Sequence, residues 1–273
     1  MKKTKVLWLV YKRLRTAFGV TLGFVVIYGA YTKNLNFALL PIAIGFYLIQ
    51  LAGDLYNDSQ NYAEDTRNLK PDKWTTQGLM SKENVRLLSV FSGLLGLSIL
   101  LFTNSEVFLL GLVCAFTGIA YSHPSINLKQ KEVFGYLLVS IPVFFFPFVW
   151  NTYFQRVLTT MDIYFGFFCG FHYLYLYFQK DATDNKDEMN VFIGRGWKNA
   201  SLLTVLFSTL ALLFFTPFTL VSIPLFLVWV TLASANTMNL YLIFTRKISW
   251  KVRSRLVLIK FLVPYMYAGA SFI

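Results

Sequence analysis

The chain of 273 residues is strongly apolar and basic: 56% of its residues are hydrophobic, 18% are aromatic and 14% are charged, with a net charge of +12. Soluble domains carry charge on roughly a quarter of their residues, so this composition excludes an ordinary soluble protein and indicates a polytopic membrane protein. The two cysteines, Cys114 and Cys169, lie in apolar segments and are expected to be buried thiols without a disulfide or metal role.

Uncharged runs long enough to cross the hydrocarbon core, about 17–25 residues, follow one another along the chain. The expected spans are 16–32, 34–53, 87–105, 107–128, 133–155, 163–179, two helices within 199–245 that turn at Thr216 and Pro217, and 256–273, where Lys260 can snorkel. The first run lacks a small-residue cleavage site and is therefore expected to be a span and not a signal peptide. The sequence predicts an all-α bundle of nine transmembrane helices, a single domain over residues 1–273.

The basic residues orient this bundle. Of the 25 Lys and Arg residues, 23 lie in the segments that share a side with the N-terminus, namely 1–15, 54–86, 129–132, 180–198 and 246–260. The opposite side holds only Lys33 and Arg156. The sequence therefore predicts a protein of the inner or plasma membrane, and the positive-inside rule places its N-terminus and the acidic segments 54–65 and 181–188 in the cytoplasm. The charge is then explained by topology and contact with anionic lipid, and a nucleic-acid partner is not expected.

Carboxylates gather in two windows, 54–65 and 181–188, which hold eight of the thirteen acidic residues and begin where apolar segments end. If each adjoining span continues as a helix, one face of the first carries Asp54, Asp58, Asn61 and Asp65 beside Asn57, and one face of the second carries Asp181, Asp184 and Glu188. Oxygen ligands without nearby His or Cys suit a hard cation such as Mg²⁺. The alternative is a solvated acidic loop that offsets the neighbouring basic residues.

Three sequence motifs resemble those of the UbiA superfamily of intramembrane prenyltransferases. The first is NDSQNYAED at 57–65, followed by Asn68, by Lys-Pro-Asp at 70–72 and by Gly78; the second is KDATDNKDE at 180–188. Between them, YSHP at 121–124 with Leu128 and Lys129 resembles the loop after the fourth helix of that family. The motifs occur in the family's order, on the second, fourth and sixth expected spans.

The resemblance implies a helical bundle around a central cavity and the transfer of a polyprenyl group from prenyl diphosphate to a lipophilic acceptor, with Mg²⁺ as cofactor. It implies metal ligands at Asn57, Asp58, Asn61, Asp65, Asp181, Asp184 and Glu188. It implies diphosphate contacts at Tyr121, Ser122, Lys129, Arg67, Lys70 and Lys73, with Asp58, Asp184, Lys129 and Tyr121 in the catalytic roles. Its partners would be these two substrates and membrane lipid, with no obligate protein partner.

This chain departs from the family pattern at two places. Asn61 stands where the first motif has a second aspartate, and Glu188 stands where the second motif ends in aspartate. Asn61 keeps a carbonyl ligand but loses a charge, which weakens metal binding unless Asp54, one turn earlier, replaces it. A terpene cyclase of the same superfamily and an inactive member that only binds prenyl lipid therefore stay open. A transporter is less expected, because it would place its carboxylates at mid-depth.

Other polar residues in the spans have structural and functional interpretations. His172 can line the cavity or hydrogen-bond between helices, and His123 belongs to the Tyr-Ser loop. Asn236 and Asn239 are expected to join helices. Arg195 is a further candidate for the diphosphate, and the aromatic run 144–150 is expected to pack rather than to shield a cation.

Overall fold

The structure is a computed structural model of the chain. It describes residues 25, 28–29, 31–33, 37, 39–67, 74–75, 77–128, 131–184, 197–221 and 223–245, without the side chains of 64, 67, 132, 180–184, 197–199 and 224. Within these ranges every regular element is a helix, so the predicted all-α class is confirmed for them. The last predicted span, 256–273, and most of the first lie outside the described residues.

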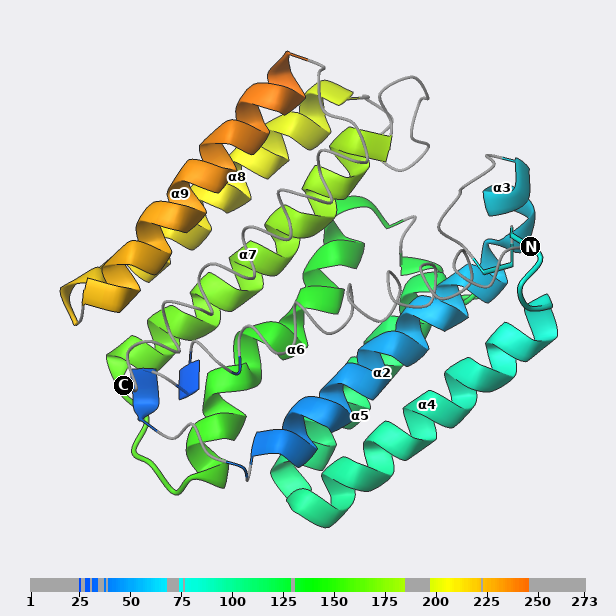
Figure 1. Ribbon diagram of the computed structural model, residues 1–273, viewed down its shortest axis with the longest axis horizontal. Helices are drawn as coiled ribbons and strands as arrows, with labels where there is room; N and C mark the ends of the chain where they lie inside the picture. Colours follow the sequence, from blue (N-terminus) through cyan, green and yellow to red (C-terminus); the bar gives the residue numbers. More distant parts are fainter. Residues whose placement is uncertain are drawn as a thin grey trace. The chain divides into compact units, whose positions relative to one another are not determined.

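The described residues fall into two compact units, the first of them between Asn36 and Lys129. It contains α2 (Leu39–Gln60), α3 (Tyr62–Arg67), α4 (Lys82–Thr103) and α5 (Ser105–Ser122). Figure 1 shows α2 and α4 side by side along their length. Their approach depends on Gly96, because a Cβ atom there would meet the carbonyl oxygen of Gly45 at 2.7 Å. Small residues at such crossings let the backbones of membrane helices pack closely.

Side-chain caps fix the ends of α4 and α5. Ser81 accepts a hydrogen bond from the backbone N–H of Asn84 at 3.2 Å and caps the start of α4. Asn104 follows α4 and precedes α5, and its Oδ1 accepts from the backbone N–H groups of Glu106 and Val107 at 2.9 and 3.0 Å. Both caps accept hydrogen bonds from N–H groups in the first turn, which have no acceptor within the helix.

The second unit comprises the described residues within Gly23–Leu35 and Gln130–Ile273. Its elements are α6 (Glu132–Tyr153), α7 (Thr160–Asp184), α8 (Trp197–Phe215), the 3₁₀ helix η2 (Thr216–Leu220) and α9 (Ile223–Phe244). In Figure 1, α7, α8 and α9 run beside one another, and α7 also packs on α6. The two helices expected within 199–245 are present, but the turn between them lies about five residues after Thr216 and Pro217, because η2 continues α8 to Leu220 and α9 begins at Ile223.

Among the described residues, six helices are long and apolar enough to cross a membrane, by length and composition: α2, α4, α5, α6, α8 with η2, and α9. The 25-residue α7, predicted as a span over 163–179, is not among these six. The count of nine crossings stays a prediction, since parts of the chain lie outside the described residues. That the two units form one domain also stays a prediction.

One end of the second unit holds a buried polar network that the sequence did not predict. The Tyr28 hydroxyl donates to Oδ1 of Asp162, and Asn151 Nδ2 donates to that hydroxyl at 3.0 Å. The second carboxylate oxygen accepts from the backbone N–H and the hydroxyl of Thr159, both at 2.7 Å. Arg156 extends the network by donating to Asn151 Oδ1 at 3.2 Å. A fully buried carboxylate is thereby satisfied by several donors, as low-dielectric surroundings require.

Candidate functional site

The first acidic window lies on one continuous helical path. Although α2 ends just before Asn61 and α3 begins just after it, the Asn61 N–H donates to the Asn57 carbonyl at 3.0 Å and the Asp65 N–H donates to the Asn61 carbonyl at 2.8 Å. Asp54, Asp58, Asn61 and Asp65 therefore share a face, as the spacing predicted. Asp58 and Asp65 are buried, with 3% and 2% of their surfaces exposed.

A hydrogen bond joins this window to the end of α5. Oδ1 of Asn57 accepts from the Ser122 hydroxyl at 2.7 Å and from Asn61 Nδ2 at 2.8 Å. Ser122 is the last residue of α5 and is buried. Two of the three motifs are thereby brought into direct contact, one through Asn57 and the other through Ser122.

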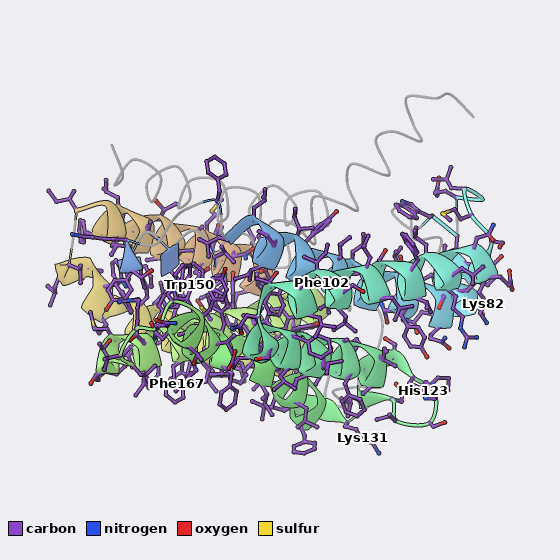
Figure 2. All side chains as sticks on the ribbon, turned by 90° about the horizontal axis from the view of Figure 1, so that it is seen from below. Lys82, Phe102, His123, Lys131, Trp150 and Phe167 are labelled. Carbon is purple, nitrogen blue, oxygen red and sulfur yellow. The ribbon has the colours of Figure 1, made fainter. Side chains whose placement is uncertain are left out.

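The rest of the Tyr-Ser loop turns sharply at the end of α5. The backbone N–H of His123 donates to the Ile119 carbonyl at 2.9 Å, and its Nδ1 accepts from the Ser125 N–H at 3.3 Å. Figure 2 places His123 and Lys82 at the same end of the first unit, with Phe102 at the other end. The His123 side chain thus stabilises the local turn through its hydrogen bond with Ser125. Lys129 lies outside the described residues.

The second acidic window begins on α7, whose helix includes Asp181 and Asp184 as predicted. The structure describes the backbone of these two residues but not their side chains, and the same holds for Arg67. Four further predicted site residues lie wholly outside the described part of the chain: Glu188, Lys70, Lys73 and Arg195. The expected meeting of Asp58 and Asp184 across one cavity therefore stays a prediction.

The chemistry of the first window fits a hard divalent cation. Two buried carboxylates on one helix face repel each other and are costly to desolvate, and a bound cation removes both penalties. Among the described side chains no group of three His, Cys, Asp or Glu residues surrounds a common point. The carboxylates of Asp58 and Asp65 would supply only part of the oxygen shell that Mg²⁺ takes.

Three further polar residues of the second unit are buried. Asn239 Nδ2 donates to the Tyr175 hydroxyl at 2.7 Å and so joins α9 to α7, which confirms its expected role. His172 is buried between Phe168 and Tyr175, each with a ring centroid 5.6 Å from the imidazole. Asn236 is buried one turn before Asn239, and both of its amide atoms lack a hydrogen-bond partner within the described residues.

Comparison with known proteins agrees with this architecture. Residues 16–262 match the UbiA prenyltransferase family. A UbiA homolog from Archaeoglobus fulgidus bound to GPP and Mg²⁺ has a similar structure, with a TM-score of 0.68 at 13% identity over 97% of this chain and 98% of that one. The same homolog bound to DMAPP and Mg²⁺ gives a TM-score of 0.65 at 14% identity, over 96% and 98% of the two chains.

A further solved structure, of digeranylgeranylglyceryl phosphate synthase in membranes, gives a TM-score of 0.56 at 14% identity, again over 96% of this chain and 98% of that one. No curated protein matches the chain. At these identities the likeness to solved structures shows the fold, whereas the family match extends over most of the sequence. The chain belongs to the UbiA prenyltransferase family.

Proposed function

We propose that this protein transfers a prenyl group from a prenyl diphosphate to a lipophilic acceptor within the membrane, in a reaction that depends on Mg²⁺. The observation that carries the proposal is the pair of buried carboxylates, Asp58 and Asp65, on the continuous helix of the first family motif. Family membership supports it, as do the A. fulgidus homologs bound to Mg²⁺ with DMAPP or GPP.

The metal ligands in this proposal are carboxylates of the two windows: Asp58 and Asp65 with Asp181, Asp184 and Glu188. Mg²⁺, when bound, neutralises the charge that builds on the departing diphosphate. Tyr121, Lys129, Arg67, Lys70 and Lys73 are the proposed partners of the diphosphate, because Lys and Arg make strong charge-assisted hydrogen bonds to phosphate oxygens. Aromatic side chains stabilise a nearby carbocation and keep water away from it until the acceptor reacts.

We place the protein in the inner or plasma membrane, with the motifs on the cytoplasmic side, because the basic residues concentrate there. A terpene cyclase of this superfamily would begin with the same loss of diphosphate. It would differ in the fate of the allylic carbocation, which would be captured by a double bond of the same prenyl group. Analysis of products with and without an acceptor separates these two activities.

The test is diphosphate release from geranyl diphosphate by the purified protein. EDTA should abolish the release and Mg²⁺ should restore it. Asp58→Ala should lower turnover by about 100-fold or more, since each lost interaction with the developing charge has an effect of that order. Glu83→Ala is the matched control, because this exposed carboxylate at the start of α4 should leave turnover unchanged. Equal turnover in the two variants, or full turnover in EDTA, would contradict the proposal.

A further inference from the structure

Among its described side chains, the buried face of α9 is apolar except at two asparagines one turn apart. The apolar members of this face are Leu225, Val228, Leu232, Ala235 and Ile243. Asn236 and Asn239 lie among them, with 2% and 0% of their surfaces exposed. Polar side chains inside a membrane bundle are costly, and they mark either an interhelical hydrogen bond or a functional site.

The two asparagines differ in their hydrogen bonds. The side-chain amide of Asn239 is bonded to the Tyr175 hydroxyl on α7 at 2.7 Å. Both amide atoms of Asn236 lack a hydrogen-bond partner within the described residues, and so does one amide atom of Asn239. This accounting does not depend on which way either amide is turned. Both atoms of Asn236 are unpaired, and a tyrosine hydroxyl can donate to an amide oxygen or accept from an amide nitrogen.

Burial of the unpaired Asn236 amide destabilises the folded protein. Both of its polar atoms are inaccessible to solvent, so hydration does not compensate for the missing hydrogen bonds. A leucine has nearly the same volume and would continue the apolar face of α9 without this cost. Unpaired buried polar groups are rare in native proteins, and those that occur concentrate where a ligand or a mechanism uses them. Asn236 therefore indicates a ligand that supplies the missing partner.

The helices α7 and α9 run parallel to each other. Phe168, near the start of α7, contacts Phe215 at the end of α8, with ring centroids 4.6 Å apart. Phe178, further along α7, contacts Phe207, which lies earlier in α8, at 5.3 Å. These contacts make α7 antiparallel to α8. The short turn after η2 makes α9 antiparallel to α8 as well, and the three helices lie beside one another in Figure 1.

The bond between Tyr175 and Asn239 then sets the register of the two parallel helices. His172 lies three residues before Tyr175, and Asn236 lies three residues before Asn239, so the buried imidazole and the unpaired amide are at the same level. These four residues form a polar cluster within the second unit. At a rise of 1.5 Å per residue, the cluster lies about 14–18 Å along α7 from Asp184 and is separate from the acidic windows.

We propose that Asn236 binds the hydroxyl group of the lipophilic acceptor, with Asn239 beside it as a second contact. An amide with both atoms unpaired offers a donor and an acceptor, and a hydroxyl group both accepts and donates. The prenyl group of the other substrate is a hydrocarbon and forms no such bond. The inference deepens the proposed function and rests on it, since it names the chemical class of the acceptor. Rotation of the Asn236 side chain or a small shift of α9 admits the hydroxyl.

A leucine at position 236 separates a ligand contact from a structural one. In the absence of substrates, Asn236→Leu should raise the unfolding midpoint of the purified protein, because it removes an unpaired amide and keeps the volume. Asn239→Leu should lower the midpoint, because the bond to Tyr175 is lost. Thr237→Leu is the matched control. Thr237 is exposed, its hydroxyl bonds only to the Ala233 carbonyl of its own helix, and its replacement should leave the midpoint unchanged.

Three pairs of probes that differ by one hydroxyl group test the ligand class without prenyl diphosphate: 2-naphthol and naphthalene, 4-hexylphenol and hexylbenzene, and 1-decanol and decane. Affinities are compared between proteins in the same detergent, so the partition of each probe into micelles cancels. Asn236→Leu should weaken binding of the hydroxyl-bearing member of at least one pair about three- to tenfold, the effect of one hydrogen bond, without weakening binding of its counterpart. Thr237→Leu should change neither affinity.

An unchanged or lower unfolding midpoint in Asn236→Leu would overturn the inference, because the amide would then stabilise the protein without a ligand. Loss of affinity for both members of every pair, or for neither, would overturn it as well, since Asn236 would then not recognise the hydroxyl. The proposed function fails separately. A protein that prefers hydroxyl-bearing probes through Asn236 but releases no diphosphate from any prenyl diphosphate refutes transfer and leaves the binding role intact.

Discussion

Removal of one hydroxyl group from the polar network of the second unit should destabilise the protein strongly. Tyr28→Phe keeps the ring, which stacks on Phe165 with centroids 4.5 Å apart, and deletes the donor to Asp162 and the acceptor of Asn151. A hydrogen bond to a charged group contributes about 1.5–3 kcal/mol. A neutral interhelical bond in a membrane protein contributes about 0.6 kcal/mol on average. The expected loss of unfolding free energy is therefore about 2–3.6 kcal/mol.

Thermal unfolding of the purified protein in detergent measures this loss. A protein of this size shifts by about 2–4 °C for each kcal/mol, so the midpoint should fall by about 4–14 °C. Tyr164→Phe is the matched control on α7, because its ring lies against Phe214 and its hydroxyl makes no hydrogen bond within the described residues. Equal midpoints for Tyr28→Phe and the wild type would refute the reasoning, since the buried Asp162 would then not depend on that donor.

Two further predictions concern packing and topology. Gly96→Ala should lower the unfolding free energy by about 1–3 kcal/mol, because its Cβ would lie 2.7 Å from the Gly45 carbonyl oxygen. Gly93→Ala is the control and should be tolerated, because its Cβ would meet its nearest atom at an ordinary 3.4 Å. Equal unfolding midpoints for the two variants would contradict this prediction. In a background without the two native cysteines, single cysteines at Thr66 and Thr103 should react with an impermeant thiol reagent from opposite sides of the membrane. Reaction from the same side would show that the predicted alternation of spans is wrong.

The sequence predicted helices more reliably than it predicted where they end. Charge marks the limit of the hydrocarbon core, and a helix continues beyond that limit whenever its backbone hydrogen bonds can form. The span predicted at 34–53 is α2 over Leu39–Gln60, and its helical hydrogen bonds continue to Asp65. The same reasoning gave the extension of α7 to Asp184, which places part of each acidic window on a helix.

Contacts between distant residues were beyond the reach of pattern analysis. Tyr28 and Asp162 are 134 residues apart, and Ser122 and Asn57 are 65 apart, so neither pair leaves a periodic signal. A single acidic residue in the first turn of α7 was the only indication of the Asp162 network. Hydrogen-bond direction was equally hidden, because an asparagine in a metal motif offers both a carbonyl oxygen and an amino group.

The single-residue connection between α4 and α5 couples the insertion of two helices into the bilayer. Asn104 has an extended backbone, with φ −170° and ψ 143°, and donates its N–H to the Leu100 carbonyl at 3.0 Å while its side chain caps α5. The two helices therefore form a tight helical hairpin, in which one helix cannot shift along its axis without the other. The position of Ser122, at the far end of α5, is thereby tied through the length of that helix to the position of Asn104.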